Sequence, residues 1–113
     1  MGLTKEHILS ADDLPREKVD VPEWGGQVWV RALTASERDA FELSVTGDKG
    51  TMQNLRARFA VLVLVDEKGA RLFSDGEAAA LGAKSAAALD RVFTVGQKIN
   101  ALSEEDVEGL VKN

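Results

Sequence analysis

The sequence predicts an α+β fold: a mostly helical single domain, residues 1–113, in which an N-terminal β-hairpin packs on a small helix bundle. Valines alternate with polar residues on both sides of a Gly-Gly pair, a pattern typical of two strands joined by a turn. Beyond residue 34, apolar residues recur at helical spacing, and glycines and capping residues separate the segments. With 113 residues, the chain is long enough to bury one hydrophobic core.

The predicted hairpin centres on VPEWGGQVWV, residues 21–30, with the turn at Gly25-Gly26. Successive side chains of a strand point to opposite faces, so Trp29 is expected on the face opposite the valines. Two strands alone are marginally stable, so we expect helices to cover the valine face. The valines expected to be buried there are Val19, Val21, Val28 and Val30.

One helix is expected before the hairpin and one after it. The stretch LTKEHILSADDL has Thr4 as a plausible N-cap, a small apolar face and Pro15 as its stop. The stretch TASERDAFELSVTG begins with Thr34 and Glu37 in capping-box spacing and is expected to end at Gly47. Residues 47–50, GDKG, are predicted to form a flexible tip.

The segment from about Met52 allows two interpretations. Its apolar residues follow helical spacing, which favours a helix to about Leu64. The β-branched run VLVLV is also compatible with a buried strand that pairs with ARLF, residues 70–73, across the DEKG turn. We prefer the helix.

Three further helices complete the prediction. Ser74 and Glu77 form a capping box for a short helix that ends near Gly82, and Ser103 with Asp106 caps a last helix. The longest pattern lies between them in KSAAALDRVFTVGQKINAL, where one broad apolar stripe is typical of a helix at the centre of a bundle. The stripe comprises Leu89, Val92, Phe93, Gly96 and Ile99.

Composition excludes several classes of function. The formal net charge is −5, and without a basic stripe such a chain is poorly suited to nucleic acid. The chain has no cysteine, its N-terminus is too charged for a signal peptide, and the run FAVLVLV is too short to span a bilayer. We therefore expect no nucleic-acid or membrane partner and a cytoplasmic location.

Catalytic and metal-binding motifs are not evident in the sequence. His7, the single histidine, lies in a short helix near the terminus, where a surface role is expected. The segment DEKGARLFSDGE fails the calcium-loop register, and acidic clusters are typical of capping and solvated helix ends. No phosphate loop or GxSxG motif is present. The expectation is a protein without catalytic residues, metal or cofactor.

A protein-binding role remains, with Trp24, Trp29 and Arg31 as the candidate partner-binding residues. Tryptophan and arginine are enriched at interface hot spots, and all three lie on or beside the hairpin. The alternative is that both tryptophans pack under neighbouring segments.

Read together, these segments resemble the tail assembly chaperones of long-tailed bacteriophages and prophages. The resemblance begins in ILSADDLPREKVDVPEWGGQVWVRALTASERDAFE and covers nearly the whole chain. Its recurring positions in the first half are Val19, Val21, Pro22, Glu23, Trp24, Gly25, Gly26, Val28, Val30, Arg31, Leu33, Thr34, Glu37, Arg38 and Asp39. Those in the second half are Asn54, Arg56, Asp66, Gly69, Leu72, Phe73, Leu81, Lys84, Ser85, Leu89 and Val92. Trp29 departs from the pattern, where a polar or charged residue is expected.

The resemblance implies a non-catalytic factor that binds the tape measure protein, keeps it soluble and helps recruit tail tube subunits. It implies action in the host bacterial cytoplasm and absence from the mature virion. A homo-oligomer is a further candidate form, since a small domain alone covers little of a long helix. The alternatives are a minor tail or head–tail joining protein retained in the virion, and a small enzyme with an unrecognised site. Many such chaperones also have a longer form made by ribosomal slippage, for which Lys112-Asn113 is a candidate site when the Val111 codon ends in A.

Overall fold

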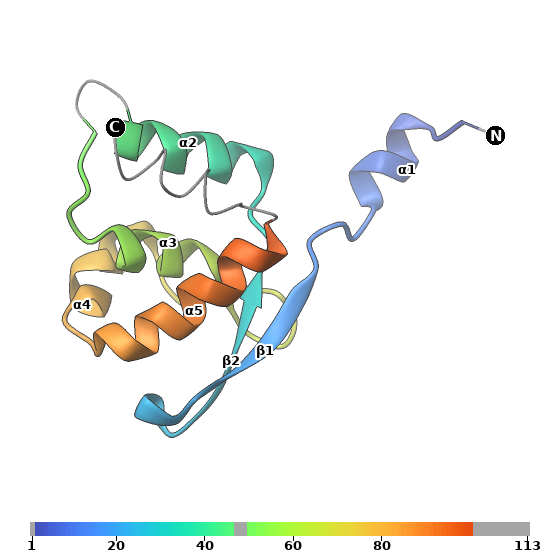
Figure 1. Ribbon diagram of the computed structural model, residues 1–113. Coiled ribbons are helices and arrows are strands. Elements are labelled where there is room, and N and C mark those ends of the chain that lie inside the picture. Colours follow the sequence, from blue (N-terminus) through green and yellow to red (C-terminus); the bar gives the residue numbers. More distant parts are fainter. Residues whose placement is uncertain (1, 47–49, 101–113) are drawn as a thin grey trace.

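The computed structural model describes residues 2–46 and 50–100. Residues 47–49 of the predicted tip at 47–50, the Ser103–Asp106 cap and the Lys112-Asn113 site lie outside them. Within these ranges a three-stranded antiparallel sheet packs against helices (Figure 1). The elements in chain order are α1 (Lys5–Ser10), β1 (Arg16–Val21), the 3₁₀ turn η1 (Pro22–Trp24), β2 (Gly26–Arg31), α2 (Ala35–Thr46), α3 (Leu55–Val63), β3 (Leu64–Val65), the 3₁₀ turn η2 (Asp75–Glu77), α4 (Ala78–Gly82) and α5 (Ala86–Ile99).

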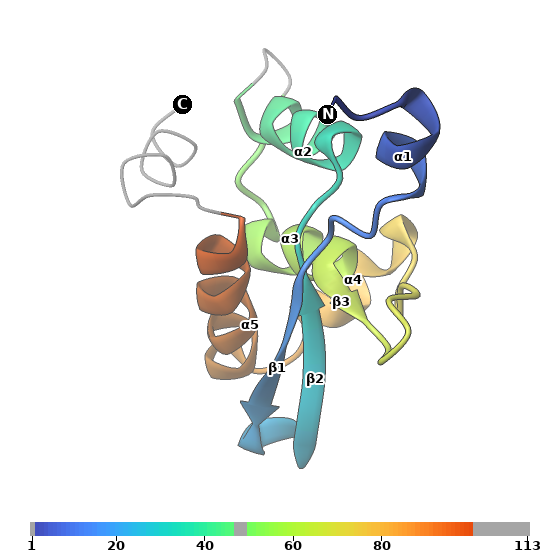
Figure 2. The ribbon, with the colours of Figure 1, turned by 90° about the vertical axis from the view of Figure 1, so that its right-hand side faces the viewer.

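The sheet has the order β1-β2-β3, and α5 packs against β1 and β2. Helix α3 packs against α5, and its buried side chains share one core with the hairpin valines. Figure 2 shows the hairpin in front of α3, with α5 beside it. Val21 and Val30 are fully buried, and Val19 is 8% exposed. The expected valine face is therefore confirmed, except that Val28 is only partly buried at the outer end of the hairpin.

Phe59 of α3 occupies the centre of the core. Its ring makes edge-on contacts with Phe41 of α2 at 5.5 Å and with Phe93 of α5 at 5.2 Å between ring centroids. Gly96 faces the same ring, and a Cβ atom there would overlap it, with Phe59 Cζ 2.8 Å away. One aromatic side chain thus joins three helices, and the absence of a side chain at residue 96 lets α5 approach it.

The expected helix starts are largely confirmed. Thr4 caps α1, and Ser74 and Glu77 form their capping box. Ser85 caps α5, which was not predicted from the sequence. The predicted apolar stripe of α5 faces the core, with Leu89, Val92 and Gly96 buried.

Two boundaries differ from the predictions. Helix α1 ends at Ser10, well before Pro15, because Asp12 and Asp13 follow it and acidic residues are unfavourable at the negative end of a helix. The hairpin turn is also longer than Gly25-Gly26: Pro22 opens a 3₁₀ turn, Gly25 adopts a left-handed conformation with φ 77°, and Gly26 already pairs with Val21.

The segment from Met52 combines both interpretations. The helix is confirmed as α3, although it begins at Leu55 and ends at Val63. The next two residues form β3, which pairs with β2 through Leu64 opposite Val30 and Val65 opposite Trp29. The ARLF segment contributes a single bridge, from Arg71 to Val65.

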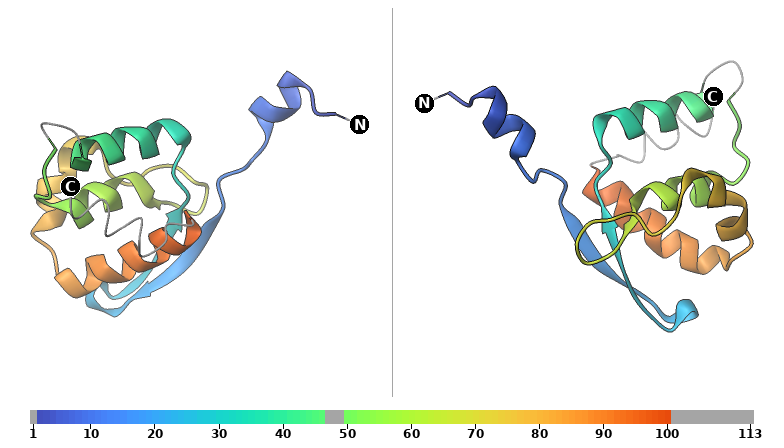
Figure 3. Two further views of the ribbon diagram at one scale, coloured as in Figure 1. Left: turned by 45° about the horizontal axis from the view of Figure 1, so that its top comes forward. Right: turned by 180° about the vertical axis from the view of Figure 1, so that it is seen from behind.

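Helix α1 projects from the body, as both views of Figure 3 show. It buries no residue, and its large apolar side chains are exposed, Ile8 at 57% and Leu9 at 75%, as is Leu3 just before it at 76%. The small apolar face expected here exists, but nothing in the described part of the chain covers it.

Candidate partner-binding surface

The register of the hairpin places Trp29 opposite the valines, as predicted. Lys18 lies directly across from Trp29, and Arg16 lies across from Arg31. Directly opposed residues of an antiparallel pair share a face, so these four side chains belong to one face. We call this face, with Asp20 and Gln27 at its outer end, the hairpin outer face.

Trp29 is partly exposed at the centre of the hairpin outer face. Its neighbour on the β3 side is Val65, which is only 1% exposed, so the indole shares a face with a buried side chain. On the β1 side, Arg16 Cζ lies 5.7 Å and Lys18 Nζ 5.4 Å from the centroid of the indole ring. Cations at such distances are attracted to the electron-rich face of an indole. Trp29 therefore combines a partly buried body with a surface bordered by positive charge.

Trp24 lies at the tip of the hairpin, at the end of η1. It is partly buried against the core. The neighbouring Glu23 accepts hydrogen bonds from Arg91 of α5 at 2.9 and 3.2 Å, and these hydrogen bonds hold the pKa of the Glu23 carboxyl below its usual value. The tip is thus tied to α5, and Trp24 presents only part of its ring to solvent.

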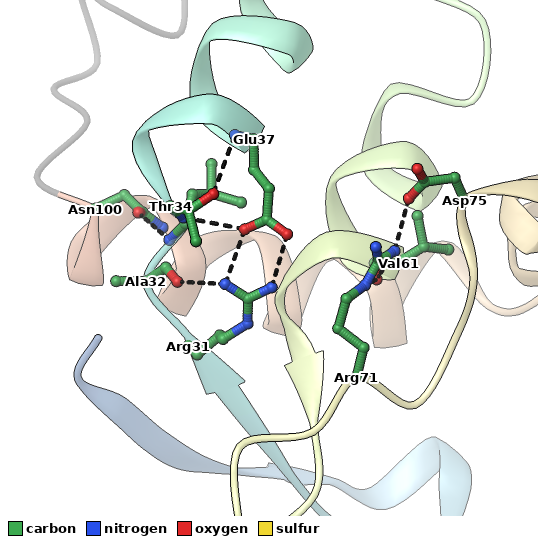
Figure 4. A network of polar contacts seen from close by, with 9 residues as sticks. Arg31, Ala32, Thr34, Glu37, Val61, Arg71, Asp75 and Asn100 are labelled. Atoms are coloured by element: carbon green, nitrogen blue, oxygen red, sulfur yellow. Dashed lines mark hydrogen bonds and ion pairs between the residues drawn. The ribbon is translucent and has the colours of Figure 1, made fainter. Parts of the chain in front are cut away.

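Arg31 has a different environment from the two tryptophans, because it is only 6% exposed. Its guanidinium donates hydrogen bonds to both carboxylate oxygens of Glu37, at 2.8 and 2.9 Å, and to the carbonyl of Ala32 (Figure 4). Glu37 also accepts from the backbone N–H of Thr34 at 3.0 Å, which is the predicted capping box. Arg31 thus joins the end of β2 to the start of α2.

Asn100 extends this network to the end of α5. Its side-chain oxygen accepts a hydrogen bond from the Leu33 N–H at 2.8 Å, and its side-chain amide donates to the Gly96 carbonyl. Figure 4 shows Asn100 beside Thr34 and Glu37. The connection between the hairpin and the helices is therefore fixed by hydrogen bonds on both sides.

A hollow of about 440 Å³ borders the inner end of the hairpin outer face. Arg16, Arg31 and Lys68 contribute positive charge to its lining, and Asp12 contributes one negative charge. Sequence reasoning did not identify Arg16, Lys18 or Lys68 as members of this surface. The alternation of REKVDV places Arg16 and Lys18 on one face, but their position beside Trp29 depends on the hairpin register.

Among residues 2–46 and 50–100, no three His, Asp or Glu side chains are grouped so as to hold a metal ion. In the same ranges, no helix combines the length and apolar character needed to cross a membrane. His7 is exposed, and its Nδ1 accepts a hydrogen bond from the Thr4 N–H within the capping box of α1. The distinctive feature of the described surface is therefore its exposed apolar and aromatic side chains.

Comparison with known proteins identifies the family. The family model described as phage tail assembly chaperone matches residues 4–109. The chain belongs to the phage tail assembly chaperone family. A search of curated proteins found no match.

The structure of the bacteriophage HK97 tail assembly chaperone has the same fold. The TM-score is 0.60 at 17% sequence identity, and the match covers 86% of this chain and 94% of the HK97 chain. At this identity the likeness concerns the fold alone. The role of a phage tail assembly chaperone implies a tail-related protein as its partner. Members of this family are generally non-catalytic.

Proposed function

We propose that this tail assembly chaperone binds the tape measure protein of its phage, keeps it soluble and helps recruit tail tube subunits. It acts in the host bacterial cytoplasm and is absent from the mature virion. Family membership supports the general role. The finer assignment relies on the surface, because a chaperone for an aggregation-prone helical protein needs apolar contacts that are accessible in its free state.

The observation that carries the proposal is the exposure of large apolar side chains on a small acidic domain. Apolar side chains that gather on an exposed segment mark interaction sites in soluble proteins, and three of those exposed here, Leu3, Ile8 and Leu9, lie on or next to α1. Within the described residues, the exposed members are Leu3, Ile8, Leu9, Leu43, Met52 and Leu72. Trp24 and Trp29 add partly exposed aromatic rings, which supply large contact areas at interfaces.

The predicted partner-binding residues therefore take two roles in the proposal. Trp24 and Trp29 contact the partner directly. Arg31 is 6% exposed and has little surface to offer, so it acts as a positioning residue that holds the hairpin against α2 through Glu37.

We also propose that the chain self-associates. A single small domain covers only a short part of a long helical client, and several copies are needed to shield it. The uncovered apolar side chains of α1 are the candidate contacts between copies.

Co-expression with the tape measure protein tests the main proposal. We expect soluble tape measure protein in the presence of the chain, co-purification of the two, and no chain in purified virions. Equal soluble yields with and without the chain would reject the proposal. Detection of the chain in virions would favour the joining-protein alternative. The slippage site at Lys112-Asn113 stays a prediction, which the codon for Val111 and the reading frame that follows will decide.

A further inference from the structure

Arg16 differs from every other arginine in the described part of the chain. Five of the others form ion pairs with carboxylates: Arg31, Arg38, Arg56, Arg71 and Arg91. Arg58 donates to backbone carbonyls and to the Ser44 hydroxyl. Within residues 2–46 and 50–100, Arg16 has neither a carboxylate partner nor a hydrogen-bond acceptor, and its contact is with the face of Trp29.

Lys18 and Lys68 also have no carboxylate within ion-pair distance among the described residues. Lys18 lies over Trp29, and Lys68 lines the hollow beside Arg16. Asp20, at the outer end of this face, accepts a hydrogen bond from the neutral Gln27 at 2.7 Å and keeps its negative charge, and Asp12 contributes a second one at the hollow. On a chain of net charge −5, the two side chains that lie over the partly exposed indole, Arg16 and Lys18, are thus both cations without an ion-pair partner among the described residues.

We propose that the hairpin outer face binds an acidic amphipathic helix of a protein partner, with an apolar side chain on Trp29 and carboxylates at Arg16 and Lys18. The inference deepens the proposed function, on which it rests for the source of the segment: the tape measure protein. It goes further by stating which kind of segment is recognised.

The spacing of the two cations fits such a helix. Arg16 and Lys18 are two residues apart on one face of a strand, a separation of about 7 Å along the strand. Two carboxylates four residues apart on a helix have Cβ atoms about 6 Å apart, so they lie on one face of the helix, where an apolar stripe can run beside them. A helix with Glu at i and i+4 beside leucine therefore places its charges opposite both cations while leucine covers the indole.

A nucleic-acid partner fits the same surface less well. Affinity for a phosphate backbone comes from many cations along a track, whereas in the described part of this acidic chain two cations lie over Trp29 and Lys68 lines the adjoining hollow. Single-stranded DNA is therefore included in the test as a competing occupant.

The test uses Trp29 as its own reporter. Because the chain has two tryptophans, Trp24→Phe leaves Trp29 as the single indole. The unsubstituted chain and this variant are both titrated with amphipathic peptides of about 18 residues, five helical turns, that differ only in carrying Glu, Gln or Lys beside the leucine stripe. Calorimetry of the unsubstituted chain measures the affinity, and Trp29 emission in the variant reports contact at the indole.

We expect the affinity of the Glu peptide to be about tenfold or more above that of the Gln peptide, because two partly desolvated charge contacts are gained. The Lys peptide should not bind. Added salt should weaken the Glu complex. Arg16→Gln with Lys18→Gln should reduce its affinity to that of the Gln peptide, while Lys84→Gln with Lys98→Gln, an equal change of charge elsewhere, should not. Unchanged circular dichroism and melting temperature establish that each variant is folded.

Several outcomes would overturn the inference: absence of binding, equal affinity for the Glu and Lys peptides, insensitivity to Arg16→Gln with Lys18→Gln, or tighter binding of single-stranded DNA. Its failure is distinguishable from that of the proposed function. If the chain keeps the tape measure protein soluble but peptide affinity does not depend on the charges of Arg16 and Lys18, only the inference is rejected. Acid-selective peptide binding without any effect on tape measure solubility would reject only the function.

Discussion

Arg31 of β2 and Glu37 of α2 form a bidentate ion pair, with Nη1–Oε1 at 2.8 Å and Nη2–Oε2 at 2.9 Å. Arg31 is almost fully buried. The planar guanidinium matches both carboxylate oxygens at once. The pair therefore fixes the angle at which the chain leaves the hairpin and enters the helices.

Arg31→Lys should weaken this connection, because a lysine ammonium cannot reproduce the two parallel hydrogen bonds and would leave buried acceptors unmatched. We expect a loss of about 1–3 kcal/mol in the free energy of unfolding, measured by urea denaturation. Arg38→Lys is the matched control, since the Arg38–Glu42 pair is half-exposed and such pairs contribute about 0–1 kcal/mol. Equal losses for the two variants would contradict the structural role of Arg31.

Glu37 also predicts a pH dependence. Burial alone would raise the pKa of its carboxyl, but hydrogen bonds from Arg31 and from the Thr34 N–H outweigh burial, and the pKa lies below the usual 4.5. Because the folded-state pKa is depressed, the stabilisation is complete above the unfolded-state pKa and is lost as pH falls through the folded-state value. Stability should therefore decline below about pH 4.5. Glu37→Gln should flatten that decline in melting experiments, and an unchanged acid profile would contradict the assignment.

The elements that local chemistry determines were predictable from the sequence. Capping pairs such as Thr34 with Glu37 satisfy backbone groups within a few residues, so their spacing identifies a helix start. The alternation around Trp29 likewise predicted its face. The end of α3 was predicted to within one residue, but the pairing of Leu64 and Val65 with β2 was not, since it is a contact between segments far apart in sequence.

The candidate surface was predicted only in part, for the same reason. Residue type made Trp24 and Trp29 candidate contact residues, but their surroundings depend on the hairpin register. Arg31 is identical in type to Arg16, and residue type alone did not show that Arg31 is neutralised by Glu37 while Arg16 has no carboxylate.

Gly96→Ala tests the close approach of α5 to the core. A methyl group at residue 96 would overlap the ring of Phe59, which also packs against Phe41 and Phe93 and has little space to move. We expect a loss of about 1–3 kcal/mol, typical of overpacking, even though alanine is the better helix former. Gly76→Ala is the control, because its Cβ would meet no atom within 4 Å. A Gly96→Ala variant as stable as the control would contradict this packing.

Ile8→Ser with Leu9→Ser tests the role of α1. Since α1 buries no residue, the melting temperature of the domain should change little. If α1 provides contacts between copies, the variant should show a lower average mass in sedimentation equilibrium than the parent chain at the same concentration. A large loss of stability would show instead that α1 packs on its own domain in solution.

The two faces of the hairpin predict opposite consequences for neighbouring residues. Val30 is fully buried, so Val30→Asp places an unpaired charge in the core and should prevent folding, while Val30→Ala should cost about 2–3 kcal/mol. Trp29→Ser removes a partly exposed ring, and the lost cover over Val65 should cost only about 1–2 kcal/mol.

The functional consequences should run the other way. Val30→Ala, although less stable, keeps the hairpin outer face intact and should still maintain soluble tape measure protein at a temperature where it is folded. Trp29→Ser should remain folded by circular dichroism and yet give markedly less soluble tape measure protein in co-expression. If Trp29→Ser retains full solubilising capacity, the client is bound elsewhere, and the exposed residues of α1 become the surface to test.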